Sequence, residues 1–423
     1  MRTKLLFLLF PLFSFGQGYT SYFTGNPTNI STTPSFGICM MGGATESDEA
    51  MTWLLQKANG GDVLVLRSTG SNGYNNYLYS ELGVTVNSVE TLVITSVAGA
   101  TNPYVLDKIA NAELIWFAGG DQYNYLSFFK NNAAETALNN HVNIKNAPIG
   151  GTSAGMAILG NFYFSAQNGS VTSAQALANP FATNMTIGGN DFLEIPYLQN
   201  TITDTHYDNP DRKGRQTAFL ARLTQILNQR SFGIAANEYV AICVESDGKA
   251  YVYGDYPNYQ EFAYFLQTNC NSVFPETMTP NTPLTWSYNA QAVKVFRVAG
   301  TTSGTNYFDL SDWQTGSGGA WENWSVNNGT LSIAPGLPVE CNLDTEKFSS
   351  ENATIYPQPF RDVLNILSND KSQISIFDLQ GREMIQFTSI GEAKFQTSDW
   401  STGIYILKIQ CEDKVLFKKI IKN

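Results

Sequence analysis

Residues 147–159 read Ala-Pro-Ile-Gly-Gly-Thr-Ser-Ala-Gly-Met-Ala-Ile-Leu. The apolar run Ala147–Ile149 predicts a strand, and Met156–Leu159 predicts a helix-like segment. Between them, Gly151-Thr152-Ser153-Ala154-Gly155 has the G-x-S-x-G spacing of a nucleophile elbow, in which a serine is carried on a tight strand-to-helix turn. Ser153 is therefore our candidate nucleophile, although glycine-rich strand-helix turns also bind phosphates.

Short apolar runs bounded by glycine flank this turn and alternate with helix-length segments. Such runs are typical of strands buried on both faces of a parallel sheet, and the segments between them are long enough for crossover connections. The pattern predicts an α/β fold with a doubly wound, mostly parallel sheet over residues 36–255. Its expected strands are Ile38–Met41, Val63–Leu66, Leu92–Ile94, Leu114–Phe117, Ala147–Ile149, Gly233–Ala236, Tyr239–Val244 and Ala250–Tyr253.

A serine nucleophile needs a base within hydrogen-bonding distance, and the chain has only two histidines. His206 lies in Asp204-Thr205-His206-Tyr207-Asp208, a charged setting that suits a general base and equally an ordinary surface histidine. His141 lies in a polar segment before the elbow strand, and we expect it at the surface. His206 is the preferred candidate.

Glycines after the expected strand Leu114–Phe117 are candidates for an oxyanion site. Gly119 and Gly120 follow this strand, and ligands of open α/β sheets gather at the carboxyl ends of strands. Their backbone N–H groups could donate to an oxyanion, and Gln122 could donate to substrate. A helix entry capped by Asp121 is the alternative interpretation.

Together these segments resemble the cyanophycinase and dipeptidase E family of serine peptidases. The resemblance covers about residues 36–255 and rests on motifs in the family's order, namely GGA at 42–44, FAGGDQ at 117–122, GGTSAGMAI at 150–158, DTHYDNPDRKGR at 204–215 and GIAANE at 233–238. It implies a fold like that of class I glutamine amidotransferases. It also implies a serine-type hydrolase that cleaves peptide or isopeptide bonds near aspartate and needs no cofactor or metal.

The resemblance also implies residue roles. Ser153 would be the nucleophile and His206 its base, and the N–H groups of Gly120 and Ala154 would be the oxyanion donors. Positions that would contact substrate are Gln122, Asp204, Arg212 and Arg215. Thr205 and Pro210 depart from the cyanophycinase pattern, which puts cleavage of cyanophycin itself in doubt. The acid that orients His206 is left open among Glu194, Asp191, Asp204 and Glu238.

The two ends of the chain predict export. Residues 1–18 combine a basic start with an apolar stretch too short to span a bilayer, as in a signal peptide. Residues 353–423 resemble the C-terminal sorting domain of type IX secretion cargo, with YPQPF, IFDLQGRE and STGIY in the right order. This resemblance implies passage through the periplasm of a Gram-negative bacterium to the medium or cell surface. The pattern of strands and turns predicts a small β-sandwich for this module.

The remaining segments complete the expected organisation. Residues 19–35 are a polar lead-in, residues 256–342 a β-rich extension of the catalytic domain, and residues 343–352 a charged linker. The extension contains Trp313, Trp321 and Trp324, which either pack internally or line a binding face. The second interpretation supports an alternative function, that of a catalytically inactive surface binding protein on the same fold.

Composition limits the classes of partner. The formal net charge is −11, so we expect no nucleic acid partner, because an acidic body repels phosphate. The expected partners are a peptide substrate and the secretion machinery, and a homodimer is left open. Cys39 and Cys243 lie in apolar runs and are predicted to be buried, whereas Cys270 and Cys341 are candidates for a disulfide that spacing alone does not establish.

Overall fold

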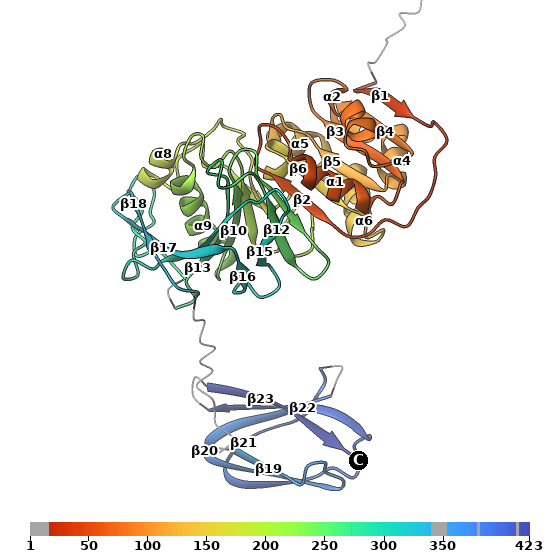
Figure 1. The fold of residues 1–423 in the computed structure, drawn as a ribbon. Coiled ribbons are helices and arrows are strands. Elements are labelled where there is room, and N and C mark those ends of the chain that lie inside the picture. The colour runs from red at the N-terminus through yellow and green to blue at the C-terminus, as the bar shows by residue number, and fades with distance from the viewer. Residues whose placement is uncertain (1–16, 272, 340–352, 379–380, 412–413) are drawn as a thin grey trace, which may run out of the picture. The chain divides into compact units, whose positions relative to one another are not determined.

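The computed structural model describes residues 17–271, 273–339, 353–378, 381–411 and 414–423 (Figure 1). Its contacts divide the chain into one unit that ends at Val339 and a second that begins at Glu340. Most of the predicted signal peptide and the linker 343–352 lie outside the described residues. The predicted lead-in includes β1 (Tyr19–Gly25), which pairs with β4 (Ser88–Ile94).

The first unit contains a ten-stranded sheet in the order β1-β4-β3-β5-β6-β2-β11-β12-β15-β16. The run from β4 to β2 is parallel, and the pairings outside it are antiparallel. Parallel pairing aligns the carboxyl ends of these central strands at one edge of the sheet. The other strands are β2 (Ile38–Met41), β3 (Asp62–Arg67), β5 (Leu114–Phe117), β6 (Ile149–Thr152), β11 (Ala241–Val244), β12 (Lys249–Tyr253), β15 (Asn306–Asp309) and β16 (Gly316–Ser317).

Helices cover both faces of this sheet. Successive residues of β3 contribute alternately to two hydrophobic cores, as expected for a strand with both faces buried. One core contains α1 (Asp48–Lys57), which begins where the Ser47 side chain caps the backbone N–H of Ala50. The other core contains residues of α3 (Val97–Ala100), α4 (Pro103–Asn111), α5 (Gln122–Phe129), α6 (Ala133–Asn143) and α7 (Ala154–Ala157). Two short turns of helix precede β4, namely α2 (Gly73–Asn76) and the π-helix η1 (Tyr77–Glu81).

A second sheet of eight strands has the order β18-β17-β14-β13-β10-β9-β7-β8. Its β7, β9 and β10 are parallel to one another, and α8 (Ser173–Ala178) and α9 (Lys213–Leu227) pack in a core on one of its faces. The other face shares a core with the first sheet, to which Phe265 and Phe296 contribute. The strands are β7 (Phe162–Phe164), β8 (Ile187–Gly189), β9 (Thr201–Asp204), β10 (Phe232–Ala236), β13 (Phe262–Thr268), β14 (Val293–Ala299), β17 (Gly319–Asn327) and β18 (Thr330–Pro335).

This arrangement differs from the single doubly wound sheet that we predicted. The fold is mixed α/β with a parallel region, but the chain leaves the first sheet after β6 and builds the second. The two helices that directly follow the elbow are short: α7 has four residues and α8 has six. A return to the first sheet as a neighbouring parallel strand would need a long crossover connection. Strands of the predicted extension 256–342 join both sheets.

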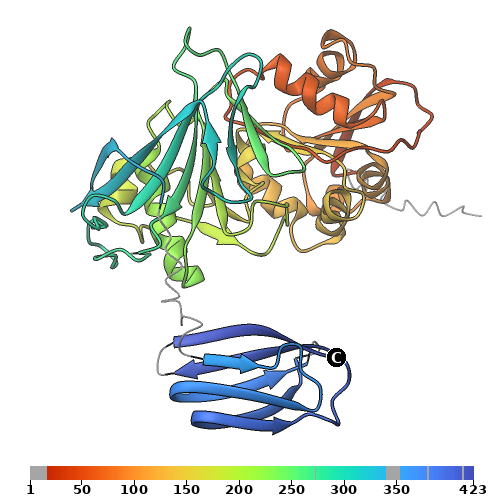
Figure 2. The same ribbon diagram turned by 60° about the horizontal axis from the view of Figure 1, so that its bottom comes forward.

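The second unit is one antiparallel sheet that curls around its own core (Figure 2), not the predicted pair of sheets. β20 (Val363–Phe377) and β21 (Glu383–Gln396) pair along most of their length, with a register shift between Ser368 and Ser372. Such irregularities bend a strand pair, so one long hairpin supplies both sides of the core. The remaining strands are β19 (Ala353–Tyr356), β22 (Gly403–Cys411) and β23 (Lys414–Lys422).

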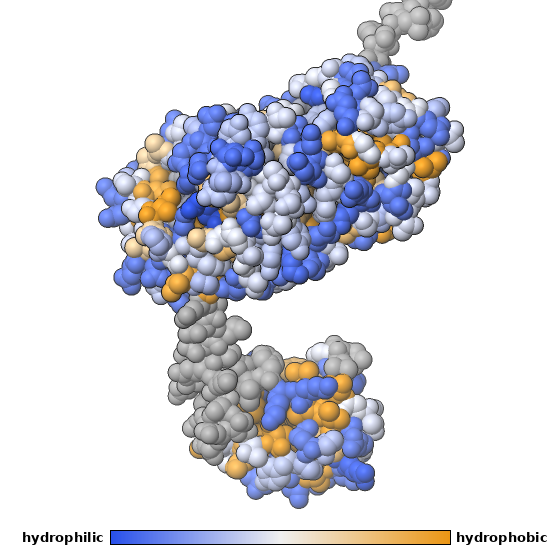
Figure 3. Space-filling view, viewed as in Figure 1, coloured by the Kyte–Doolittle hydropathy of each residue, from blue (hydrophilic) through white to orange (hydrophobic). Residues whose placement is uncertain are grey.

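Figure 3 shows a mostly hydrophilic or neutral face on the first unit, with separate hydrophobic patches. Within the described parts of the chain, no helix has both the length and the apolar character needed to cross a bilayer. Buried apolar side chains instead concentrate in four clusters inside the two units.

Candidate active site

Ser153 lies on a strained turn between β6 and α7. Its φ of 52° and ψ of −114° are unusual for a residue with a side chain, and its N–H donates to Met41 O at 3.1 Å. A Cβ on Gly151 would lie 2.6 Å from Gly155 C, and one on Gly155 would lie 2.1 Å from Phe117 O. The G-x-S-x-G spacing is therefore required by close backbone packing on both sides of the serine.

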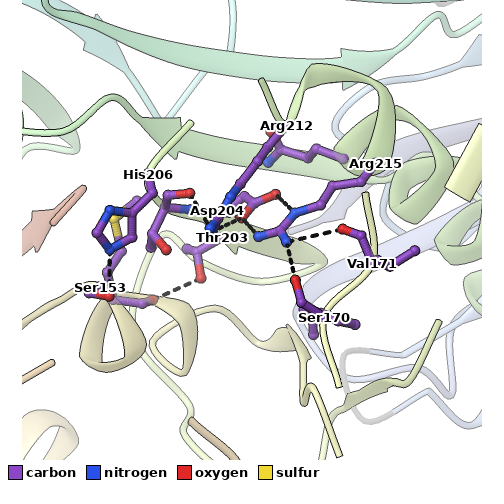
Figure 4. Close-up of polar contacts among 12 residues, drawn as sticks. Ser153, Ser170, Val171, Thr203, Asp204, His206, Arg212 and Arg215 are labelled. Atoms are coloured by element: carbon purple, nitrogen blue, oxygen red, sulfur yellow. Dashed lines mark hydrogen bonds and ion pairs between the residues drawn. The ribbon is translucent and has the colours of Figure 1, made fainter. Parts of the chain in front are cut away.

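His206 reaches this serine from the second sheet (Figure 4). Its Nε2 lies 2.8 Å from Ser153 Oγ, and it follows the carboxyl end of β9 by two residues. The loop after β2 holds it in place, since His206 N–H donates to Gly42 O at 2.7 Å. A Cβ on Gly43 would come within 2.4 Å of His206 Cε1. The GGA turn is thus a surface against which the imidazole packs.

Glu238 contacts the other nitrogen of this imidazole. Its Oε1 lies 2.6 Å from His206 Nδ1, and Asn209 Nδ2 donates to its Oε2 at 3.3 Å. The Glu238 N–H donates to Asp208 Oδ1 at 3.0 Å, which ties the loop after β10 to the loop after β9. The hydrogen bond with His206 is the main cause that lowers the pKa of Glu238 below its ordinary value. Ser153, His206 and Glu238 thus form a continuous chain of side-chain contacts.

The glycines after β5 lie beside the serine. A Cβ on Gly119 would lie 3.5 Å from Ser153 Cβ, and Gly120 has a φ of +151° that favours glycine. The Asp121 side chain accepts a hydrogen bond from the N–H of Tyr123, so it also caps α5. The helix cap that we gave as the alternative interpretation is therefore present, and the same segment places Gly119 beside Ser153.

Asp204 and Arg215 form a buried ion pair behind His206 (Figure 4). Arg215 Nε donates to Asp204 Oδ2 at 2.8 Å and its Nη2 donates to Oδ1, so the pair is bidentate. Asp204 is 2% exposed and Arg215 is 4% exposed. The predicted substrate contacts of these two residues are therefore wrong, because each spends its charge on the other. The pair instead braces the end of β9 directly before His206.

Arg212 is the guanidinium that keeps free hydrogen-bonding capacity near this site. Its Nη1 donates to Thr205 O at 2.9 Å, while its buried Nε has no hydrogen-bond partner among the described residues. The side chain is 20% exposed. Burial, followed by the charge of Arg215, lowers its pKa from the ordinary arginine value. Its Nη1 also lies 3.9 Å from Asp204 Oδ1, so Arg212 is a partly exposed guanidinium that faces the Asp204 carboxylate.

All these groups come from the carboxyl ends of strands that belong to two different sheets. The first sheet supplies the segments after β2, β5 and β6, and the second supplies the segments after β9 and β10. The described residues contain no cluster of three or more histidine, cysteine or acidic side chains suited to a metal. The arrangement is one for nucleophile activation by a neighbouring imidazole and carboxylate.

Two family models match the chain. Residues 73–250 match peptidase family S51, and residues 354–423 match the secretion system C-terminal sorting domain. Residues 73–250 of this chain thus resemble peptidase family S51. This match indicates a peptidase, and the sorting domain indicates handling by the type IX secretion system, with secretion or attachment at the cell surface.

Solved structures with similarity to this chain are distant. A peptidase from an acI-B1 actinobacterium has 14% identity and a TM-score of 0.39, with 53% of this chain and 90% of that chain covered. A candidate peptidase E protein from Listeria monocytogenes EGD-e has 16% identity and a TM-score of 0.33, with 51% and 97% covered. No curated protein matches the chain.

Two other acids that we considered as partners of His206, Asp191 and Glu194, lie elsewhere in the first unit. Asp191 forms an ion pair with Lys130 and accepts a hydrogen bond from Tyr163. Glu194 has an exposed side chain, and its backbone contacts Asn139 and Asn143 of α6. Both predictions are wrong, because the loop after β8 runs along α5 and α6 and not along β9.

The structure also tests our predictions for one histidine, two cysteines and three tryptophans outside the site. The prediction that His141 lies at the surface is wrong, since it is 2% exposed, its Nε2 contacts Pro148 O at 3.0 Å, and burial lowers its pKa to about 4. Cys39 and Cys243 are buried on paired strands, as predicted. Trp324 is fully buried, and Trp313 and Trp321 pack against a core, so the interpretation as internal packing holds.

Sequence reasoning missed two features of the site. The Gly42-Gly43 turn was a motif without an assigned role, and only its contact with His206 supplies one. Asn209 was not singled out, although it contacts the second oxygen of Glu238. Its position between His206 and Arg212 was the available signal, because loop residues near a candidate base often contribute to the same site.

Proposed function

We propose that this peptidase uses a serine nucleophile, with Ser153, His206 and Glu238 as a catalytic triad. The observation that carries the proposal is the continuous chain of contacts from Ser153 Oγ through His206 to Glu238, at 2.8 and 2.6 Å. Both distances lie within the hydrogen-bonding reach of about 2.6–3.2 Å that joins a nucleophile to its base and the base to its orienting group. The order of groups is that of serine hydrolases in general, which are recognised by geometry.

The reaction follows from this geometry. His206 Nε2 accepts the proton of Ser153 as Oγ attacks the scissile carbonyl carbon, and the Glu238 carboxylate stabilises the imidazolium that forms. Collapse of the tetrahedral intermediate breaks the C–N bond, and the leaving amine takes the proton from His206. A water molecule then attacks the acyl-enzyme by the same route and releases the acid and free Ser153.

The N–H groups of Gly120 and Ala154 are the proposed donors to the oxyanion. Gly120 belongs to the glycine segment that lies against Ser153, and Ala154 directly follows the nucleophile, which is the usual place of one such donor. Gln122, the first residue of α5, is a proposed substrate contact. Its Nε2 currently donates to Phe164 O at 3.4 Å, a long hydrogen bond.

The proposed substrate carries a carboxylate near the scissile bond, as an aspartyl peptide does. Arg212 is the residue that supports this, because its guanidinium is desolvated, partly accessible and has an unpaired N–H. Cyanophycinase-like cleavage of peptide or isopeptide bonds near aspartate fits such a contact. Thr205 and Pro210, which depart from the cyanophycinase pattern, argue against cyanophycin itself as the substrate.

The proposed route of export begins with the N-terminal signal peptide and passes through the periplasm of a Gram-negative bacterium. The match of residues 354–423 to the sorting domain supports the second step of this route. Because the first unit holds every residue of the proposed site, removal of the sorting domain after export is compatible with activity.

Labelling with a fluorophosphonate probe tests the proposal. Wild-type protein should be labelled at Ser153, and Ser153→Ala should abolish labelling and peptide hydrolysis while the melting temperature stays close to that of wild type. Ser170→Ala is a matched control, because it removes the hydroxyl of a serine outside the proposed triad. Ser170 Oγ lies 3.4 Å from Arg215 Nη1. Labelling that survives Ser153→Ala would reject Ser153 as the nucleophile.

A further inference from the structure

A groove lies along one side of α5, which begins two residues after the proposed oxyanion donor Gly120. Its volume is about 590 Å³, within the range of small-ligand sites. One wall carries Tyr123 and Ser127 of α5 and the following Lys130, and the other is formed by the β7–β8 hairpin. Tyr123, which lines the groove, directly follows Gln122, and Gln122 Nε2 donates to Phe164 O of β7 at 3.4 Å. The groove therefore starts beside the proposed oxyanion loop.

The charges of the groove cancel within it. Lys130 forms an ion pair with Asp191, and Tyr163 OH lies 2.9 Å from Lys130 Nζ and 2.8 Å from an Asp191 oxygen. Most of the remaining lining is uncharged and polar, and Thr186 Oγ1 is buried without a hydrogen-bond partner among the described residues. A neutral occupant with hydrogen-bonding groups suits this lining better than a charged one.

β8 forms an unpaired sheet edge on the second wall of the groove. It is the last strand of its sheet, and among the described strands it pairs with β7 alone. Two of its three residues are Gly188 and Gly189, where a Cβ would come within 2.6 and 2.2 Å of the Tyr163 and Phe162 rings. These two glycines are therefore required by packing against β7, and they leave β8 without side chains of its own at these positions. An unpaired strand edge accepts an added strand.

We propose that this groove binds the substrate's own peptide chain in extended form, paired with the edge of β8. The inference rests on the proposed serine peptidase and extends it, since it makes the substrate a chain of several residues. α5, with its eight residues from Gln122 to Phe129, is about 12 Å long at about 1.5 Å per residue. An extended peptide advances about 3.3 Å per residue, so about three or four residues beyond the scissile bond occupy the groove.

Protection of Ser153 from a fluorophosphonate probe measures peptide binding without requiring turnover. The ligands are the dipeptide amide Asp-Ala and two pentapeptide amides, Asp-Ala-Ala-Ala-Ala and Ala-Ala-Ala-Asp-Ala, which extend it on opposite sides. We compare the concentration of each peptide that halves the labelling rate. For the pentapeptide that extends toward the groove, this concentration should be about tenfold lower than for the dipeptide, because main-chain hydrogen bonds add to its affinity. The same pentapeptide with N-methylated alanines should protect no better than the dipeptide.

Ser127→Trp supplies the matched variant, because Ser127 is exposed on the groove wall and a large ring there fills the groove. It should remove the advantage of the pentapeptide and leave dipeptide protection and probe labelling unchanged. Thr136→Trp, at an exposed position of α6 outside the groove, should keep the advantage. Equal protection by all peptides on wild type, or an advantage that persists in Ser127→Trp, would overturn the inference alone. Absence of Ser153 labelling would refute the proposed function and this inference with it.

Discussion

Replacing Glu238 with glutamine tests whether the carboxylate beside His206 acts on Ser153. The substitution keeps the side-chain length but removes the charge that lies 2.6 Å from Nδ1. A hydrogen bond to a charged group contributes about 1.5–3 kcal/mol, and about 1.4 kcal/mol corresponds to a tenfold change in rate. This contribution stabilises the imidazolium that forms when His206 takes the Ser153 proton. Its loss should therefore slow acylation of Ser153 by about 10- to 150-fold.

The lower part of this range is expected, for two structural reasons. The Glu238 side chain is 21% exposed, so water already weakens its interaction with the imidazole. Asn209 also holds the second oxygen at 3.3 Å, and a glutamine could keep part of this contact. A loss of about 10⁴ is the extreme known for an acid-to-amide change in a buried triad.

The rate of fluorophosphonate labelling and kcat for p-nitrophenyl acetate are the measurements. Glu194→Gln is the control, because Glu194 is an exposed acid of the same type that lies away from His206. Wild-type labelling rates in Glu238→Gln, or an equal loss in Glu194→Gln, would refute the reasoning. Melting temperatures of both variants establish that the fold is retained.

The pH dependence gives the same prediction an independent readout. The pKa of Glu238 is lowered below its ordinary value of 4.5, chiefly by the hydrogen bond to His206. A lowered carboxyl pKa means that the contribution of the ionised form is fully present above pH 4.5 and is lost as pH falls through the folded-state pKa. The difference in the free energy of unfolding between wild type and Glu238→Gln should therefore be constant above pH 4.5 and shrink as the pH falls below it.

Other contacts carry predictions of their own. Arg215→Ala should lower the free energy of unfolding by about 3–5 kcal/mol in chemical denaturation, because it leaves the buried Asp204 carboxylate without its bidentate partner. A change under about 1 kcal/mol would contradict this. Gly43→Ala should reduce fluorophosphonate labelling of Ser153 far more than Gly169→Ala. Both glycines have positive φ, but only a Cβ at position 43 would press against the His206 imidazole. Equal labelling rates of the two variants would disprove that contact. Truncation before residue 340 should abolish secretion and leave labelling intact, and normal secretion of the shortened chain would count against the sorting role.

Features that depend on neighbours in the chain were predictable from the sequence. The strands Ile38–Met41 and Leu114–Phe117 have the predicted bounds, because short apolar runs bounded by polar or glycine residues leave few other conformations. The elbow at Ser153 was equally readable, since only glycine tolerates the backbone contacts on either side of it. Motif order then indicated the peptidase family without any knowledge of contacts.

The tertiary structure alone decided which charges meet. Glu238 is 32 residues from His206 in sequence, yet it reaches the imidazole because β9 and β10 are adjacent and parallel, whereas Glu194 is nearer in sequence and points elsewhere. Arg215 looked like a substrate contact, but the first turn of α9 turns it inward onto Asp204. Such pairings depend on strand order and burial, which are set by contacts between distant segments, and spacing along the chain carries little information about them.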